Sequence, residues 1–193
     1  MNITVYCGAA DGKDPDFITR ARELGAWMAE HGHRLIYGAG NAGMMGAVSD
    51  ALIEGGGEAI GVTPQFFVLA EETRSDLSEV VIADDMSTRR NWMIDHGDAF
   101  IALPGGMGTL DEITEVMTYK RLGLLGKVNK PVMIYNVNGY YDRFFDFLDD
   151  MRAEEFCRQY DRDFVLEVTC IEDIEKALED AGAIDEERTS KYD

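Results

Sequence analysis

The sequence predicts an α/β domain in which helices cover both faces of a doubly wound, mostly parallel sheet of about seven strands. Short apolar runs alternate with segments of helical periodicity along the whole chain, and no Ser- or Pro-rich linker separates them. The apolar runs are continuous rather than alternating, as in strands that are buried on both faces. A chain of 193 residues is long enough for one such core. We therefore predict a single domain over residues 1–185 and a frayed acidic tail over residues 186–193.

The predicted strands are the short apolar runs, which are rich in residues that favour strands. In chain order they cover residues 3–7, 34–38, 58–63, 79–83, 99–103, 131–136 and 163–168. The segments between them are predicted to be helices. The first of these helices covers residues 15–31 and ends before Gly32, a C-cap residue. The others are predicted over residues 43–54, 87–95, 109–122, 140–155 and 171–180.

The charge of the chain restricts its partners. Its 37 acidic residues outnumber its 18 basic residues, and the formal net charge is −19. Such a chain repels a nucleic-acid backbone, so we expect no nucleic-acid partner and a solvated acidic surface. No run approaches the roughly 18 apolar residues that a membrane span requires. Because the net charge of the chain repels anions, any anionic ligand must be held by groups that lie directly at its binding site.

The cysteines indicate a reducing compartment. Cys7, Cys157 and Cys170 are odd in number and have no C-x-x-C spacing, so the sequence predicts neither a disulfide framework nor a zinc site. Cys7 ends an apolar run and is expected to be a small buried hydrophobe, although a reactive thiol beside the following glycine remains an alternative. The first residues have neither a basic region nor a long apolar region of a signal peptide. We therefore expect a cytoplasmic protein.

Three glycine-rich loops follow predicted strands, over residues 7–12, 38–46 and 104–109. In an open parallel sheet, ligands bind beyond the carboxyl ends of the strands, where loops lead into helix N-termini. Glycine lets backbone N–H groups approach an anion, and the helix dipole favours its charge. A phosphate is the natural ligand, and Gly8, Gly40 and Gly43 are candidate contacts. For the second loop, tight turn geometry and close helix packing are the alternative explanation.

The third loop, PGGMGT, leads into a segment with three carboxylates. We expect the N–H groups of Gly105, Gly106, Met107 and Gly108 to bind the phosphate. Thr109 is expected to cap the helix and to donate its hydroxyl to a phosphate oxygen. Asp111 and Glu115 are also explained by ordinary charge preferences at a helix start. Glu112 is the candidate that reaches back from the first turn toward the ligand.

Arg89 and Arg90 are the informative basic residues, because the chain has few of them and they follow the fourth strand. Neighbouring residues do not share one face of a helix. One arginine is therefore expected to reach the pocket while the other points elsewhere. Surface ion pairs with Asp84, Asp85 or Asp95 are the alternative.

The motif PGGMGTLDE resembles the P-G-G-x-G-T-x-x-E signature of the LONELY GUY (LOG) family, cytokinin riboside 5′-monophosphate phosphoribohydrolases that have long been mislabelled as lysine decarboxylases. VYCGAADG and YGAGNAGMMGAVSDA resemble other motifs of that family. IGVTP, MSTRR, DAFIALPGG and LGLLGKVNKPVMIYNVNGYYD follow in family order and spacing. The resemblance covers residues 2–156 and is much more specific than any one glycine motif.

The resemblance implies a Rossmann-like fold and a homodimer, or a higher homo-oligomer, with pockets near the subunit interface. It implies hydrolysis of the N-glycosidic bond of an adenine-type nucleoside 5′-monophosphate to free base and ribose 5-phosphate, with no metal or organic cofactor. The catalytic residues of the family fall on Arg89 and Glu112. By family position, other residues would line the nucleotide site: Glu71, Arg90, Asp111 and Thr118.

Elementary chemistry agrees with these roles. Cleavage of the C1′–N bond builds oxocarbenium character on the ribose, which the Glu112 carboxylate can stabilise while it orients or deprotonates the attacking water. Arg89 stays charged at any ordinary pH, so we expect it to bind the ligand and fix Glu112 rather than to donate a proton.

The chain departs from the family pattern at five positions, namely Ala9, Ala10, Ser87, Arg90 and Tyr119. Ser87 and Tyr119 can change the shape of the pocket wall that contacts the base. The substrate can therefore be AMP, a prenylated adenine nucleotide or another purine nucleotide. A nucleotide-binding module without turnover is the alternative function. A decarboxylase would require pyridoxal phosphate on a lysine, and Lys120, Lys127 and Lys130 have no Schiff-base context.

Overall fold

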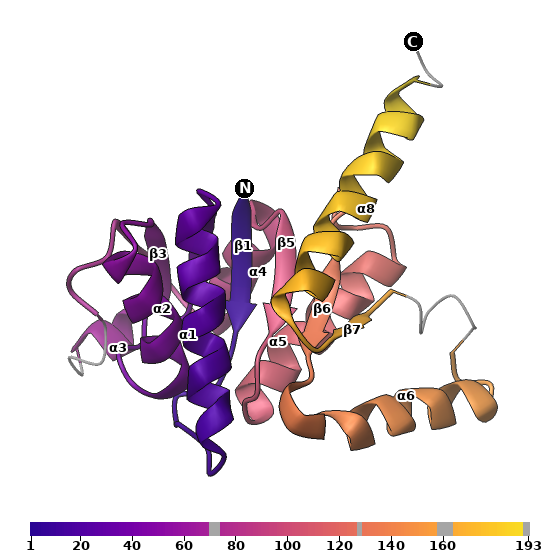
Figure 1. Cartoon of the computed structure of the whole chain (residues 1–193), viewed down its shortest axis with the longest axis horizontal. Coiled ribbons are helices and arrows are strands. Elements are labelled where there is room, and N and C mark those ends of the chain that lie inside the picture. Colours follow the sequence, from indigo (N-terminus) through magenta and orange to yellow (C-terminus); the bar gives the residue numbers. More distant parts are fainter. Residues whose placement is uncertain (70–73, 127–128, 158–163, 191–193) are drawn as a thin grey trace.

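The computed structural model describes residues 1–69, 74–126, 129–157 and 164–190. In these residues the strands form one sheet with the order β4-β3-β2-β1-β5-β6-β7 (Figure 1). Each pairing between neighbouring strands is parallel, which confirms the predicted sheet. The strands are β1 (Asn2–Tyr6), β2 (Arg34–Tyr37), β3 (Ala59–Pro64), β4 (Glu79–Ala83), β5 (Ala99–Ala102), β6 (Val132–Tyr135) and β7 (Leu166–Val168).

Helices lie between successive strands, and α8 follows the last one, which confirms the α/β class. They are α1 (Pro15–Glu30), α2 (Gly43–Glu54), α3 (Gln65–Leu69), α4 (Met86–His96), α5 (Met107–Arg121), α6 (Asp142–Ala153) and α8 (Ile171–Ser190), with the 3-10 turn η1 (Val137–Gly139) before α6. No helix in the described part of the chain is long and apolar enough to cross a membrane.

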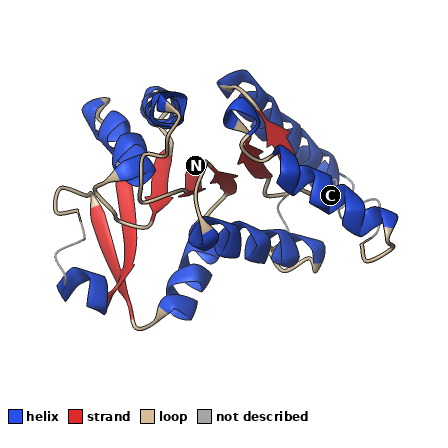
Figure 2. Cartoon of the chain, turned by 90° about the horizontal axis from the view of Figure 1, so that it is seen from below, coloured by secondary structure: helices blue, strands red, loops and turns tan. Residues whose placement is uncertain are grey.

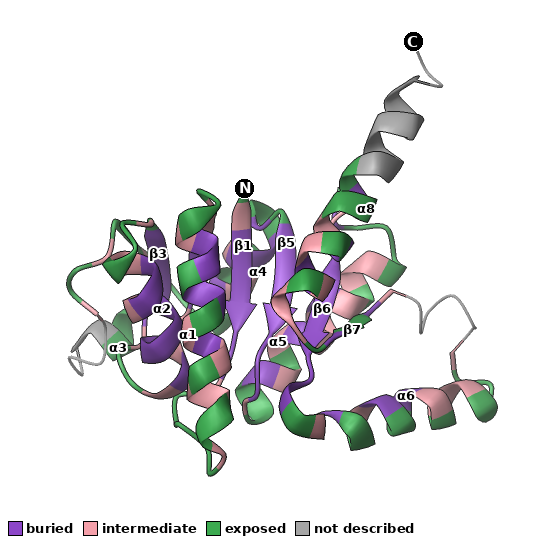
Figure 3. Cartoon of the chain, in the orientation of Figure 1, coloured by how far each residue is buried: buried purple, intermediate pink, exposed green. Residues whose placement is uncertain are grey.

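The helices lie on both faces of the sheet (Figures 1 and 2). One apolar cluster joins α1, α2 and α8 to one face, and a second joins α4, α5 and α6 to the other. Successive strand residues alternate between the two clusters: in β1, Val5 belongs to the first cluster and Tyr6 to the second. The central strands β1, β2 and β5 are therefore buried except for the first residues of β1 and β2 (Figure 3), because both of their faces are covered.

The order of the strands reverses at β1 and β5, which lie side by side in the middle of the sheet. Tyr6 pairs with Ala102 in this register, so the loops after the two strands begin at the same level. The backbone N–H of Gly8 donates to the carbonyl oxygen of Pro104 at 3.1 Å. The first and third predicted glycine loops therefore meet at the switch point, where ligands bind in sheets of this type.

Several expectations are corrected by the fold. Helix α5 begins at Met107, with Gly106 as its N-cap and no side chain bonded to the cap, so Thr109 is a buried helical residue and not the cap. Glu112 consequently lies in the second turn of α5. Strand β4 is an edge strand whose residues Val80 and Ile82 are exposed, because a continuous apolar run does not distinguish an edge from the centre of a sheet.

Two helices also differ from the expectation. The five-residue α3 follows β3 and was not predicted, because it is too short to show a helical period. Helix α8 continues ten residues beyond the expected end at residue 180 and reaches Ser190, through a segment in which five of the ten residues, two Ala, two Glu and one Arg, are good helix formers. It projects away from the sheet (Figure 1). The limits of the domain and of the tail remain predictions.

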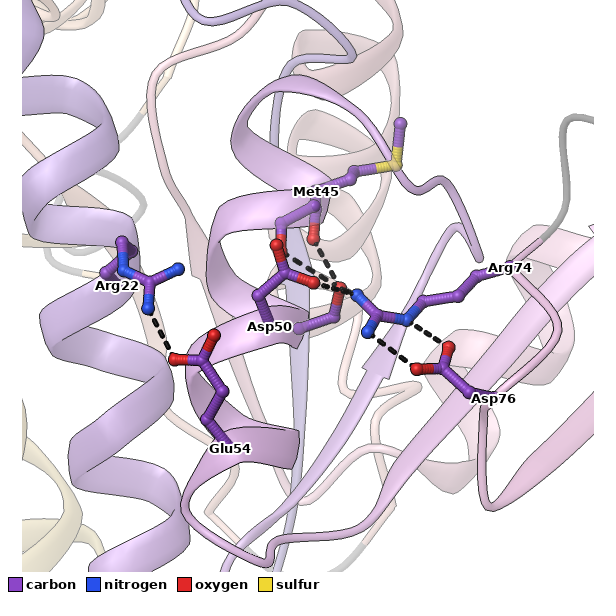
Figure 4. A network of polar contacts seen from close by, with 8 residues as sticks. Arg22, Met45, Asp50, Glu54, Arg74 and Asp76 are labelled. Carbon is purple, nitrogen blue, oxygen red and sulfur yellow. Dashed lines mark hydrogen bonds and ion pairs between the residues drawn. The ribbon is translucent and has the colours of Figure 1, made fainter.

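Arg74 anchors the connection between α3 and β4 to α2 (Figure 4). Its guanidinium forms ion pairs with Asp50 of α2 and with Asp76, and donates to the Ser49 hydroxyl at 3.1 Å. Its backbone N–H donates to the carbonyl oxygen of Ala39 in the loop after β2 at 2.9 Å. Arg74 thereby ties three segments together at the side of the sheet where the second glycine loop lies.

Candidate active site

A cavity of about 330 Å³ opens at the carboxyl ends of β1 and β2, between α2, α4 and α5. The reversed strand order at β1 and β5 brings α4 and α5 together on the same face of the sheet. The lining includes six of the predicted site residues, Gly8, Arg89, Gly106, Gly108, Thr109 and Glu112.

Arg89 and Glu112 meet inside this cavity. Arg89 comes from the first turn of α4 and Glu112 from α5, and Nη1 of Arg89 donates to Oε1 of Glu112 at 2.5 Å. Both side chains are almost entirely buried. The Nε of Arg89 also donates to the carbonyl oxygen of Val62 in β3 at 2.8 Å. A hydrogen bond to the sheet therefore fixes the guanidinium, and the guanidinium in turn fixes the carboxylate.

Burial raises the pKa of Glu112 above the ordinary value of a glutamate, while Arg89 acts in the opposite direction. The Coulombic attraction and the hydrogen bond of the guanidinium favour the charged carboxylate, but the loss of water around it is the larger effect. A carboxylate with a raised pKa accepts a proton more readily than a solvated one. Glu112 is thus suited to take a proton from a reacting water molecule.

The loop after β5 is held by close contacts on one side and is open on the other. A Cβ on Gly105 would lie 2.2 Å from Oγ1 of Thr109 and 2.9 Å from the backbone nitrogen of Gly8. In the described part of the chain, no atom beyond the neighbouring residues and the nearby helix backbone lies within 4 Å of the Cβ position of Gly106 or Gly108. Gly105 thus allows the two loops to approach each other, and the first turn of α5 presents backbone N–H groups that no side chain caps.

The loop after β2 supports Arg89 from the opposite side. A Cβ on Gly38 would lie 2.6 Å from Nη2 of Arg89 and 3.1 Å from the sulfur of Met45. Gly40 lies against Met45, and Gly43, with a positive φ of 61°, lies against the backbone of Ala9. Gly40 and Gly43 were predicted to bind substrate. The structure places both of them outside the cavity lining, where they support residues that do line it.

Arg90 points away from the cavity, as expected for the neighbour of Arg89. Its Nε donates to Oε2 of Glu115 at 2.7 Å, and its Nη1 lies 3.4 Å from Oδ2 of Asp111. These three residues join α4 to α5 beside the Arg89–Glu112 pair. Their predicted contact with substrate has no support in the lining of the cavity.

The remaining predicted site residues lie in different places. Thr118 is exposed and donates to the carbonyl oxygen of Thr114 within α5. Met107 is exposed at the start of α5, and Gly105 lines an adjoining cavity that shares Gly8 and Gly106 with the first. Glu71 lies outside the described residues. Substrate contacts by these residues stay predictions.

Several lining residues were not among the predicted site residues: Val5, Tyr6, Cys7, Ala9, Gly38, Met45, Phe67, Met86 and Met93. Most are apolar, and their sequence pattern is that of ordinary core positions. The position of Tyr6 at the last residue of β1, directly before a glycine loop, is a signal that could have indicated it. Burial raises the pKa of the Cys7 thiol, so Cys7 is the expected buried hydrophobe and is not activated as a nucleophile.

Comparison with known proteins assigns the family. A protein-family model described as "Possible lysine decarboxylase" matches residues 45–180. The cytokinin riboside 5′-monophosphate phosphoribohydrolase LOG3 of Arabidopsis thaliana is 36% identical over 189 residues, which are 98% of this chain and 86% of that protein. The cytokinin riboside 5′-monophosphate phosphoribohydrolase LOG of Oryza sativa subsp. japonica is 39% identical over 178 residues. These residues are 92% of this chain and 72% of that protein. The chain belongs to the LOG family.

Solved structures show the same fold for this LOG-family protein. The molybdenum cofactor carrier protein of Chlamydomonas reinhardtii superposes with a TM-score of 0.69 at 22% identity, over 94% of this chain and 98% of that chain. The molybdenum cofactor binding protein of Rippkaea orientalis superposes with a TM-score of 0.66 at 22% identity, over 93% and 95% of the respective chains. At this identity the likeness concerns the Rossmann-like fold alone.

Proposed function

We propose that this protein hydrolyses the N-glycosidic bond of a purine nucleoside 5′-monophosphate, with adenine or an N6-substituted adenine as the base. The products are the free base and ribose 5-phosphate. The observation that carries the proposal is the buried pair of Arg89 and Glu112 in one cavity with an uncapped helix start. The relatives from Arabidopsis thaliana and Oryza sativa are named for this class of reaction.

The geometry suggests how substrate would bind. The 5′-phosphate would accept hydrogen bonds from the backbone N–H groups at the start of α5 and from the Thr109 hydroxyl, where the helix dipole also favours an anion. Glu112 lies one turn of α5 beyond Gly108. A phosphate at the helix start therefore places the ribose beside the Glu112 carboxylate.

The reaction would use Glu112 as the base. Its carboxylate takes a proton from water while the water oxygen forms a bond to C1′ of the ribose. The C1′–N bond breaks, its electron pair leaves with the purine, and the proton taken up by Glu112 passes through solvent to the released base, which regenerates the carboxylate. The negative carboxylate stabilises the positive charge that develops on the ribose, and Arg89 holds it in place at 2.5 Å. Arg89 remains charged throughout, since a guanidinium does not lose its proton in this pH range.

Chromatographic detection of free base tests the proposal. The purified protein is incubated with AMP and with N6-substituted AMP, and the Glu112→Gln variant is the matched control, because glutamine has nearly the same shape and no charge. We expect the wild-type protein alone to release base. If a concentrated sample releases no more base than Glu112→Gln, the hydrolase function is wrong.

Arg89→Ala should also lose turnover while it stays folded, and full activity of that variant would remove Arg89 from the mechanism.

The alternative is a nucleotide-binding module without turnover. The same samples distinguish it, because such a module would bind AMP in calorimetry and release no base. The presence of both Arg89 and Glu112 in the cavity disfavours it, since a phosphate-binding loop alone would serve to hold a nucleotide.

A decarboxylase, which the family description suggests, finds no suitable lysine in the cavity lining. Burial lowers the pKa of Lys120 to about 8, but its ammonium donates to the carbonyl oxygen of Lys130 at 2.8 Å. The pocket around these two lysines shares no residue with the cavity that holds Arg89. Lys127 lies outside the described residues.

We also infer a homodimer or a higher homo-oligomer in the cytoplasm. The cysteines Cys7, Cys157 and Cys170 are free, which is consistent with a reducing compartment. Exposed apolar side chains on the edge strand β4, Val80 and Ile82, offer a surface for a second copy of the chain. Sedimentation analysis of the wild-type protein and of Ile82→Lys would test this, and a monomeric wild-type protein would contradict it.

A further inference from the structure

Tyr6 lies in the floor of the cavity between the two helices that carry Arg89 and Glu112. It is the last residue of β1, and it belongs to the apolar cluster that joins the sheet to α4 and α5. Its side chain is 2% exposed, yet it lines the cavity together with Arg89 and Glu112. The ring is therefore fixed by packing while part of the side chain faces the space that the nucleotide would fill.

The Tyr6 hydroxyl has no hydrogen-bond partner among the described residues. Two other tyrosines near the loop after β5 do have one: Tyr140 donates to the carbonyl oxygen of Gly105 at 2.7 Å and Tyr141 to that of Leu103 at 2.9 Å. Among the described residues, the enclosed hydroxyls that lack a partner belong to Tyr37 and Tyr135, so the Tyr6 hydroxyl is not sealed in the core. An unpartnered hydroxyl that faces a binding cavity is consistent with a partner that arrives with the ligand.

The Tyr6 phenol is a permanent donor. Burial raises its pKa well above the ordinary value, and the negative charge of Glu112 raises it further. The hydroxyl therefore keeps its proton at every pH at which the enzyme would work. A neutral donor can form a hydrogen bond to a group that becomes negative during a reaction without carrying a charge of its own.

The proposed hydrolysis requires such a donor. When the C1′–N bond breaks, its electron pair moves into the purine ring, and the ring nitrogens become stronger hydrogen-bond acceptors. Glu112 is proposed to take the proton of the attacking water and therefore does not serve the leaving group. Arg89 already donates hydrogen bonds from Nη1 to Glu112 and from Nε to the carbonyl oxygen of Val62. Thr109 lies at the phosphate loop.

We propose that Tyr6 is a further catalytic residue, whose hydroxyl donates a hydrogen bond to a ring nitrogen of the departing purine. The inference rests on the proposed function. It assigns stabilisation of the leaving group to a residue of the sheet, while the two helices supply the base and its positioning partner. Preorganised donors of this kind act strongly in a cavity from which water is excluded.

The test compares Tyr6→Phe with the wild-type protein on two substrates. The first is AMP, whose leaving group benefits from the donor. The second is 4-nitrophenyl ribofuranoside 5-phosphate, whose leaving group departs readily and has no ring nitrogen. Tyr37→Phe is the matched control, because Tyr37 ends the neighbouring strand β2, is fully buried and does not line the cavity.

We expect Tyr6→Phe to lose roughly 100-fold in kcat with AMP, in line with the loss of one preorganised donor. The rate with the activated substrate should stay near that of the wild-type protein. Tyr37→Phe should keep its activity with both substrates. The melting temperature and the affinity for ribose 5-phosphate report whether Tyr6→Phe is folded and has an intact phosphate site.

Three outcomes overturn the inference. Full activity of Tyr6→Phe with AMP removes the hydroxyl from the reaction. An equal loss with both substrates assigns Tyr6 to packing or positioning and not to the leaving group. A wild-type protein that releases no base refutes the proposed function itself, and the role of Tyr6 falls with it; the first two outcomes leave the proposed function intact.

Discussion

The proposed chemistry rests on one buried ion pair. Arg89 and Glu112 are 23 residues apart in the chain and meet at 2.5 Å, in an environment where burial raises the pKa of the carboxyl group. Removal of one partner of a buried pair leaves the other charge without compensation. Small changes around this pair should therefore affect catalysis more than their size suggests.

The pH dependence of kcat should report the raised pKa of Glu112. A carboxyl group with a raised pKa holds its proton to a higher pH, so the reactive carboxylate is lost earlier as the pH falls. We expect kcat to decrease on the acid side through a pKa above 4.5, the ordinary value. Arg89→Lys, which weakens the hydrogen bond to the carboxylate, should shift this limb to higher pH. Initial rates from about pH 4 to about pH 9 measure both.

An acid limb below the ordinary glutamate value would contradict this assignment. The melting temperature at each pH serves as the control, since unfolding in acid would produce a similar loss of rate.

Gly38 is expected to be essential for the position of Arg89. The Cβ of an alanine there would lie 2.6 Å from Nη2 of Arg89, so the guanidinium must move. A misplacement of about 1 Å can reduce kcat by roughly 100-fold. We expect Gly38→Ala to lose about that factor in steady-state assays of base release, with its circular dichroism spectrum unchanged.

Gly182→Ala in α8 is the matched control, because no described side chain lies within 4 Å of its Cβ position. Wild-type turnover by Gly38→Ala would show that the guanidinium can shift without loss of function.

Among the elements, α5 and the connection between α3 and β4 position the site. The first provides the uncapped N–H groups and Glu112. Helix α3, which precedes this connection, carries Phe67 of the cavity lining, and Arg74, in the described part of the connection, pairs with Asp50 of α2 (Figure 4). The stability of this connection should therefore affect both folding and the wall of the cavity.

Arg74→Ala should lower the free energy of unfolding by about 1 to 2 kcal/mol, because a mostly buried guanidinium with several partners is lost. Arg20→Ala is the control: Arg20 pairs with Glu23 on the surface of α1 at 2.6 Å, with both side chains 43% exposed. Such exposed pairs contribute less than about 0.5 kcal/mol within a helix. Urea denaturation of the two variants measures the difference, and equal losses would show that the Arg74 network does not hold the connection.

At the scale of the whole molecule, the charge of the protein opposes its proposed substrate. A net charge of −19 repels a nucleoside monophosphate over long distances, whereas the proposed phosphate site is the start of α5, whose backbone N–H groups are uncharged. Salt screens interactions between exposed charges beyond about 10 Å at 0.1 M ionic strength.

We therefore expect the KM for AMP to decrease as an inert salt is added at low ionic strength, while kcat stays nearly constant. Inhibition by uncharged adenosine should not depend on salt and is the control. A KM that rises with salt would indicate that positive side chains, and not the helix start, dominate the capture of the phosphate.

The sequence by itself determined the class of the fold and the parts of the site. Continuous apolar runs predicted all seven strands of the sheet, and the motif PGGMGTLDE with the Arg89–Arg90 pair singled out Arg89 and Glu112, which the fold brings into one cavity. The sequence did not predict the short α3, because five residues are too few to show a helical period. It also did not predict that β4 lies exposed at the edge of the sheet, because periodicity does not indicate the order of strands.

Only the tertiary structure decided how these parts meet. The reversal of strand order at β1 and β5 brings α4 and α5 together, and only then do Arg89 and Glu112 form a pair while Arg90 turns to Glu115. The burial that raises the pKa of Glu112 and leaves Tyr6 at the cavity floor also depends on this packing. The physical reason is that side-chain contacts and desolvation depend on distances in space, whereas a sequence pattern reports only what neighbouring residues favour.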